Sequence, residues 1–158
     1  MADFDYIIIG AGSAGCVLAN RLSSSGKFNV LLIEAGPTDN RFWVKTPIGY
    51  GMTFHDETIN WAYHTIPETG LGNRQLYWPR GKILGGSSSI NALVYHHGQP
   101  ADYDDWAAAG NPGWNYHAIK PVYDGFEDVI RADTQPVRMG KLTVSDVADE
   151  YHPLKSYF

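Results

Sequence analysis

The stretch Phe4-Asp-Tyr-Ile-Ile-Ile-Gly10-Ala-Gly12-Ser-Ala-Gly15 decides the fold of this chain. Residues 4–9 are mostly β-branched or aromatic and end at Gly10, which predicts a strand buried on both faces, as in a parallel sheet. The glycines open a helix over residues 16–22, where apolar side chains keep helical spacing. A second apolar strand is predicted over residues 28–33. The first 36 residues therefore predict one βαβ unit.

The glycine pattern of this unit is that of a dinucleotide-binding turn. Gly10 makes the tight turn, Gly12 lets the backbone approach a pyrophosphate, and Gly15 lets the helix pack against the strand. The helix N-terminus offers N–H groups to phosphate. Glu34 follows the second strand, about 20 residues further on, where an acid accepts hydrogen bonds from the adenosine ribose and disfavours a 2′-phosphate. The alternative is a glycine-rich turn in an unrelated α/β protein. FAD and NAD share this unit, so both remain open at this point.

Composition excludes several other classes of protein. The chain has 158 residues with 12 Lys and Arg against 17 Asp and Glu, and without a basic stripe we expect no nucleic-acid partner. One cysteine, Cys16, allows neither an internal disulfide nor a cysteine-based zinc site, which favours a reduced, cytoplasmic setting. Neither a signal peptide nor a transmembrane segment is expected, because no apolar run approaches about 18 residues. Peripheral association with a membrane stays open.

The remainder of the chain is predicted to hold short elements and few strands. Residues 38–80 are expected to form a long excursion that packs through its aromatic side chains over a ligand or a partner surface, and residues 81–98 a loop running into a helix. Helices are predicted over 101–109 and 117–130, a turn over 111–115, and one further strand over 141–147. The domain prediction is a βαβ unit (1–36), the rest of a cofactor-binding region (37–110) and the start of a connection into a substrate domain (111–158).

The segment Pro79-Arg-Gly-Lys-Ile-Leu-Gly-Gly86-Ser-Ser-Ser89-Ile-Asn91 resembles the signature of the glucose-methanol-choline (GMC) family of FAD-dependent alcohol oxidoreductases. The resemblance covers nearly the whole chain and is most similar to the choline dehydrogenase and bacterial alcohol dehydrogenase branch. Further motifs of that family occur in its order: Asn60-Trp61, Trp78-Pro79, Asp102–Trp106, Asn111–Trp114, Lys141–Asp146 and His152-Pro153.

The resemblance implies an α/β, Rossmann-like FAD/NAD(P)-binding fold, present here as the N-terminal portion of a larger two-domain flavoprotein. It implies FAD as cofactor and hydride transfer from an alcohol carbon to flavin N5, with a base removing the hydroxyl proton. The family's catalytic histidine is expected beyond Phe158, so no catalytic residue is predicted in this chain, which alone should not turn over. The sequence does not specify the alcohol, the electron acceptor or the oligomeric state.

The predicted cofactor contacts come from the glycine turn, the second strand's end and the signature segment. Gly85 and Gly86 let the backbone lie against a flat ring or a pyrophosphate, and the Asn91 amide can reach the flavin or a substrate oxygen. A simple Gly/Ser loop with a capping Asn is the alternative. The full set is Gly10, Gly12, Ser13, Ala14, Gly15, Glu34, Ala35, Arg80, Gly85, Gly86, Ser87, Asn91, Ala92, Leu93 and Val94.

Two positions depart from the family pattern. Some members link the flavin covalently to a histidine just before the signature Asn, but here that position is Ile90, which implies non-covalent FAD. His96-His97 stands where relatives commonly have an apolar residue and arginine, so a permanent charge is replaced by a titratable one. Neighbours on a strand point to opposite faces, so we expect these histidines to be surface or supporting residues. No metal site is predicted.

The sequence leaves two other functions possible. One is a non-catalytic module that binds FAD or ADP, and the other, less favoured, is an NAD-dependent Rossmann enzyme, in which the Gly85–Asn91 signature has no place. Exposed sheet edges and an unfinished core are expected to make the isolated chain prone to aggregation.

Overall fold

The computed structural model describes residues 3–130, 137–138 and 140–145, and the chain divides into two compact units, Met1–Val94 and Tyr95–Phe158. The predicted boundaries at residues 36 and 110 differ from this division and remain a prediction. The two units are described separately.

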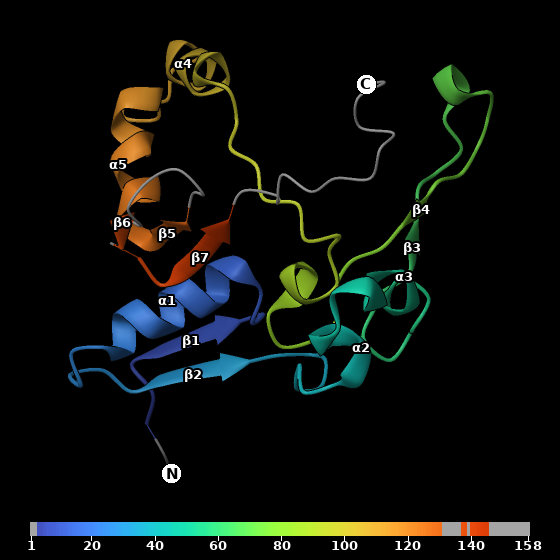
Figure 1. Cartoon of the computed structure of the whole chain (residues 1–158), viewed down its shortest axis with the longest axis horizontal. Helices are drawn as coiled ribbons and strands as arrows, with labels where there is room; N and C mark the ends of the chain where they lie inside the picture. Colours follow the sequence, from blue (N-terminus) through green and yellow to red (C-terminus); the bar gives the residue numbers. More distant parts are fainter. Residues whose placement is uncertain (1–2, 131–136, 139, 146–158) are drawn as a thin grey trace. The chain divides into compact units, whose positions relative to one another are not determined.

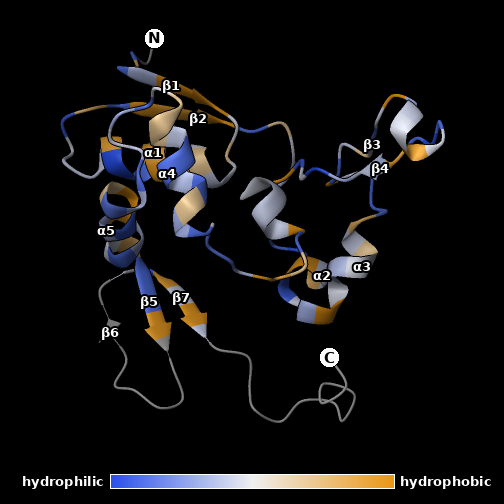
Figure 2. Ribbon diagram, turned by 90° about the horizontal axis from the view of Figure 1, so that it is seen from above, coloured by the Kyte–Doolittle hydropathy of each residue, from blue (hydrophilic) through white to orange (hydrophobic). Residues whose placement is uncertain are grey.

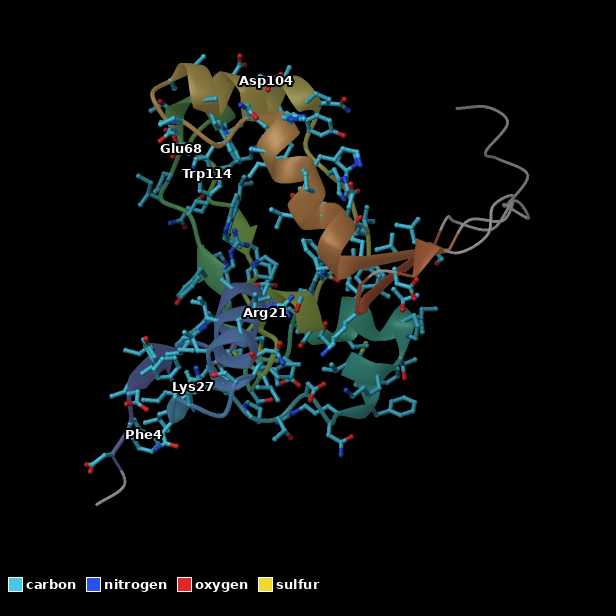
Figure 3. All side chains as sticks on the ribbon, turned by 90° about the vertical axis from the view of Figure 1, so that its left-hand side faces the viewer. Phe4, Arg21, Lys27, Glu68, Asp104 and Trp114 are labelled. Carbon is cyan, nitrogen blue, oxygen red and sulfur yellow. The ribbon has the colours of Figure 1, made fainter. Side chains whose placement is uncertain are left out.

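The first unit begins with the predicted βαβ arrangement. Strand β1 (Tyr6–Ile9) is followed by helix α1 (Ser13–Ser23) and strand β2 (Val30–Ile33), and the strands pair in parallel from Tyr6 with Val30 to Ile9 with Ile33. Figure 1 shows α1 lying over one face of this pair. Arg21, labelled in Figure 3, lies in the last turn of α1, where a cation complements the helix dipole.

Burial of β1 on both faces, predicted from its apolar run, is wrong for the part of the chain that the structure describes. Ile7 and Ile9 are 61% and 86% exposed, while Ile8 is half-buried and lies beneath the first turn of α1. Figure 2 shows the two strands as a hydrophobic band. The exposure follows from the tertiary structure: among the described residues, β2 is the only strand paired with β1, and α1 covers one face of the pair.

Residues 38–80 hold short elements, none longer than four residues. These are α2 (Phe42–Lys45), the 3₁₀ turn η1 (Pro47–Gly49), α3 (Tyr50–Thr53), β3 (Tyr63–His64), η2 (Thr69–Leu71) and β4 (Tyr77–Trp78). Strands β3 and β4 pair antiparallel and form the two sides of an arm that leads to η2, drawn in green in Figure 1. Residues 38–80 therefore fold into short helices, turns and two-residue strands around a small core.

That core is a cluster of three isoleucines. Ile59, Ile83 and Ile90 are almost fully buried and pack with Val44. The helix predicted within residues 81–98 is absent from the structure; the only regular element there is the 3₁₀ turn η3 (Gly86–Ser89). Gly85, Gly86 and Leu93 all have positive φ angles, which a right-handed helix does not accept.

The second unit packs two helices beside a three-stranded sheet. Helices α4 (Pro100–Ala108) and α5 (Tyr116–Phe126) lie close to the predicted positions. The prediction of helix up to residue 130 is wrong, because residues 127–130 form a strand. Strand β7 covers only part of the predicted 141–147, and residues 146–147, like His152-Pro153, lie outside the described residues. The strands are β5 (Glu127–Ile130), β6 (Val137–Arg138) and β7 (Leu142–Ser145), in the order β6-β5-β7.

Glu127 is the buried acid of this second unit, with 6% of its surface exposed. It accepts a hydrogen bond from the Tyr95 hydroxyl and lies 2.7 Å from Nε2 of His97, whose ring stacks on Tyr123 with centroids 4.1 Å apart. Partial burial of the Tyr95 hydroxyl and its bond to Glu127 raise the pKa of that phenol well above its ordinary value. His97 is thus a supporting residue of the fold, and its neighbour His96 is exposed.

The role of Gly15 in packing α1 gives a first prediction. A Cβ at this position would lie 1.9 Å from the Gly10 carbonyl oxygen, so Gly15→Ala forces α1 away from β1. We expect a loss of about 1–3 kcal/mol in the free energy of unfolding, measured by urea denaturation. Gly51→Ala is the matched control, because a Cβ there meets no atom within 4 Å and the residue lies in a helix. Equal urea midpoints for the two variants would contradict the packing role.

Candidate functional site

A cleft opens at the carboxyl ends of β1 and β2. Its volume is about 520 Å³. Open parallel α/β sheets bind their ligands in the crevice outside the carboxyl ends of the strands. Residues from the glycine turn, from the end of β2, from the start of the β3 arm and from the signature segment line it: Ile9, Gly10, Gly12, Ile33, Glu34, Ala35, Trp61, Tyr63, Arg80, Gly81, Gly86 and Ser87.

The glycine turn forms one wall of this cleft. Gly10 has a φ of +94°, a left-handed conformation that favours glycine, and a Cβ on Gly12 would meet no atom within 4 Å. The first bond into α1 runs from the Cys16 amide to the Gly12 carbonyl, at 2.9 Å. The amides of the three preceding residues, Ser13, Ala14 and Gly15, have no acceptor among the described residues. Open backbone and unpaired N–H groups together make a site for an anion.

Glu34 is fixed at the end of β2 by two backbone amides. Its Oε2 accepts from the Ala11 N–H at 2.7 Å and its Oε1 from the Gly36 N–H at 3.0 Å. Each carboxylate oxygen keeps a lone pair for a further donor, so the acid can still accept hydrogen bonds from a ribose. The structure therefore gives Glu34 a second role beyond the one predicted, because it ties the glycine turn to the loop after β2.

The signature segment forms the opposite wall and touches the glycine turn through backbone. The Gly85 amide donates to the Ala11 carbonyl at 2.7 Å, and a Cβ on Gly86 would lie 2.8 Å from the Gly12 Cα. Gly81 in turn packs against Gly86, since its Cβ would lie 2.2 Å from the Gly86 carbonyl oxygen. The predicted glycines of both motifs are thus brought together in space.

Two aromatic residues of the cleft were not predicted as site residues. Trp61 and Tyr63 stack with ring centroids 6.0 Å apart and an interplanar angle of 5°, and Lys82 Nζ lies 5.0 Å from the centroid of the Trp61 ring. On the signature side, the Arg80 guanidinium lies 4.9 Å from the Trp78 centroid. The sequence feature that could have indicated them is the Asn60-Trp61 motif. Because the residues around it follow neither strand nor helix periodicity, the sequence does not show which side chains point into the cleft.

The end of the signature segment lies outside this cleft. Asn91 and Leu93 line a second, small hollow of about 20 Å³ together with residues of α2, η1 and α3. The Asn91 side-chain oxygen accepts from the Leu93 amide at 2.9 Å, while Ala92 and Val94 are exposed. Seven of the predicted contacts line the cleft: Gly10, Gly12, Glu34, Ala35, Arg80, Gly86 and Ser87. Ser13, Ala14, Gly15 and Gly85 are not among the lining residues, and the assignment of all fifteen residues to a cofactor stays a prediction.

Comparison with known proteins identifies relatives of this chain. Alcohol dehydrogenase [acceptor] of Pseudomonas putida is 45% identical over 98% of this chain, and oxygen-dependent choline dehydrogenase of Photobacterium profundum is 46% identical over 82% of it. The chain spans 28% and 23% of the length of these two relatives. Both names agree with the branch that the sequence motifs indicated.

Solved structures confirm the predicted fold class. Pyridoxine 4-oxidase from Mesorbium loti matches with a TM-score of 0.85 and 34% identity, covering 98% of this chain and 30% of that protein. Formate oxidase from Aspergillus oryzae, from a study of FAD modification, matches with a TM-score of 0.83 and 27% identity over 97% of this chain and 29% of that protein. The family model for GMC oxidoreductases matches residues 4–158, and the chain therefore belongs to the GMC oxidoreductase family.

Proposed function

We propose that this chain is the FAD-binding part of an oxidoreductase that acts on the CH–OH group of an alcohol. The observation that carries the proposal is the cleft whose two walls are the glycine turn with Glu34 and the signature segment. Family membership supports it, and the names of the relatives supply the class of reaction. Because the chain spans less than a third of those relatives, the activity proposed is that of the whole protein.

The adenosine diphosphate half of FAD fits the donors and acceptors of the cleft. We assign the pyrophosphate to Gly12, beside which a Cβ would meet no atom within 4 Å, and to the amides of Ser13, Ala14 and Gly15 at the start of α1. We assign the ribose to Glu34, whose carboxylate is already oriented by two amides. A 2′-phosphate would meet this carboxylate as a like charge, which disfavours NADP.

The flavin half is assigned to the signature segment. Gly85 and Gly86 keep side chains out of the way, and the segment from Asn91 to Val94 offers backbone groups and a side-chain amide. When bound, FAD supplies an acceptor for hydride at N5. Because the chain spans less than a third of the length of its relatives, we place the base that removes the alcohol proton in a part of the protein beyond Phe158.

Ile90 supports non-covalent attachment of FAD. Its side chain is 3% exposed and packs into the isoleucine cluster with Ile59 and Ile83. A hydrocarbon side chain buried in this way offers no nucleophile to a flavin ring. The cofactor should therefore be held by hydrogen bonds and contacts alone.

For its compartment we propose the cytoplasm. The support is compositional, because the free thiol of Cys16 is half-buried and the sequence holds no second cysteine to pair with it. Of the helices in the described part of the chain, none has the length and apolar character needed to cross a bilayer.

The cofactor prediction is tested on the protein expressed from its complete gene. We expect a yellow protein that releases all of its flavin as FAD into the supernatant when it is denatured with acid. Anaerobic addition of choline or of a primary alcohol should then bleach the flavin absorbance of the native protein.

Other outcomes of this experiment favour other functions. Flavin that stays with the acid precipitate would contradict non-covalent binding. Bound FAD that no alcohol bleaches would favour a non-catalytic binding module, and a colourless protein that binds NAD would favour a nicotinamide enzyme.

Substitutions at the two ends of the cleft should separate ligand affinity from stability. Gly12→Ala adds a methyl group to open space, so it should leave the urea midpoint unchanged but weaken FAD at least about tenfold, or about 1.4 kcal/mol. Glu34→Gln replaces one acceptor oxygen by an NH₂ group facing a backbone amide, so it should cost about 1–3 kcal/mol of stability as well as affinity. Fluorescence titration of apoprotein with FAD measures the affinity, and a stable Gly12→Ala protein with unchanged FAD affinity would contradict the pyrophosphate assignment.

A further inference from the structure

Asn60 is a buried polar residue beside the cleft but outside it. Only 2% of its surface is exposed, and its side chain does not line the cavity. It lies between Ile59 of the core cluster and Trp61 of the cleft wall. A buried amide carries two donors and one carbonyl oxygen, each of which costs free energy if unpaired, so its partners reveal what it holds in place.

The donor half of the Asn60 amide faces away from the cleft. Its Nδ2 donates to the Phe54 carbonyl at 2.9 Å and to the Tyr77 hydroxyl at 3.2 Å, and that hydroxyl itself donates to the same carbonyl. This half closes the turn after α3 and joins it to β4. Its partners are absent from the set of residues that line the cleft.

The acceptor half faces the segments that form the cleft wall. The Asn60 Oδ1 accepts from the amides of Ala62 and Arg80, both at 2.9 Å. Backbone bonds run alongside, from the Trp61 amide to the Arg80 carbonyl at 2.9 Å and from the Lys82 amide to the Ile59 carbonyl at 2.8 Å. One oxygen atom thus ties the segment that carries Trp61, just before β3, to the start of the signature segment.

The acceptor half also supports a strained residue. Ala62 has a φ of +50°, in the left-handed region that costs an L-residue with a side chain about 1–2 kcal/mol. Its amide is one of the two held by Asn60, and it separates Trp61 from Tyr63, whose rings stack in the cleft. The conformation that presents this aromatic pair therefore depends on a bond from a side chain that never reaches the cavity.

We propose that Asn60 is a positioning residue for the cofactor, whose amide oxygen fixes the Ala62 and Arg80 backbones and so presents Trp61 and Arg80 to the cleft. This inference rests on the proposed binding of FAD. It assigns the two halves of one amide to different tasks: the donor half stabilises the fold, and the acceptor half shapes the ligand site.

The test compares variants that remove each half, in the protein expressed from its complete gene. Asn60→Ala removes both halves, whereas Tyr77→Phe removes only the hydroxyl that the donor half binds. We expect both to lower the melting temperature of the apoprotein. Asn60→Ala should in addition weaken FAD about tenfold, while Tyr77→Phe should keep FAD affinity within about threefold of the unsubstituted protein.

A rescue variant distinguishes positioning from stability. Glycine adopts a positive φ without strain, so Ala62→Gly in the Asn60→Ala background should recover at least about threefold of the lost FAD affinity while the melting temperature stays low. If Asn60→Ala does not fold, Asn60→Asp replaces it. That variant keeps an acceptor oxygen for the Ala62 and Arg80 amides but turns a second oxygen toward the Phe54 carbonyl, so its melting temperature should fall while FAD affinity falls by less than about tenfold.

The inference is overturned if Asn60→Ala and Tyr77→Phe weaken FAD equally, if Ala62→Gly restores nothing, or if Asn60→Asp loses FAD about tenfold. Binding of FAD by the unsubstituted protein is measured first. Its absence would overturn the proposed function together with this inference, whereas normal binding that Asn60→Ala leaves unchanged would overturn this inference alone.

Discussion

The structure of the cleft depends on a backbone-to-backbone contact between Ala11-Gly12 and Gly85-Gly86. The Gly85 amide bonds to the Ala11 carbonyl, and the two backbones approach so closely that a Cβ on Gly86 would lie 2.8 Å from the Gly12 Cα. Segments more than 70 residues apart in sequence meet here without a side chain between them. Because the contact is made of backbone alone, it holds both walls of the cleft at a fixed separation and leaves the space between them for a ligand.

The features that sequence analysis predicted correctly have local causes. The turn at Gly10, the packing of α1 through Gly15 and the position of Glu34 at the end of β2 all follow from residue type and spacing within one βαβ unit. In this unit, the positive φ of Gly10 and the exclusion of a Cβ at Gly15 depend on residues that are close in sequence. The signature segment was recognised by its resemblance to the GMC family, because its paired glycines alone are equally compatible with a simple Gly/Ser loop.

The features that were missed have distant causes. Trp61 and Tyr63 line the cleft next to Ala62, whose amide the buried Asn60 binds together with that of Arg80. The hydrophobic periodicity of the sequence gives no sign of a bond between residues 20 positions apart. In sequence, residues 127–130 continue the helical pattern of the residues before them, but in the structure they form a strand. Glu127 there accepts a hydrogen bond from Tyr95 and contacts His97, about 30 residues earlier in the chain. The exposure of Ile7 and Ile9 reflects which neighbours β1 has, and a strand's own composition does not contain that information.

The two amides bound by Glu34 have a consequence for changing the nucleotide preference of this fold. Replacing an acid at the end of the second strand by a neutral or basic residue is the direct route toward a cofactor with a 2′-phosphate. Here the same replacement would unpair the amides of Ala11 and Gly36, one in each loop at the mouth of the cleft. A redesigned protein would have to supply new acceptors for both amides before it could bind a different nucleotide. The nucleotide preference at position 34 therefore cannot be changed without also destabilising the two loops.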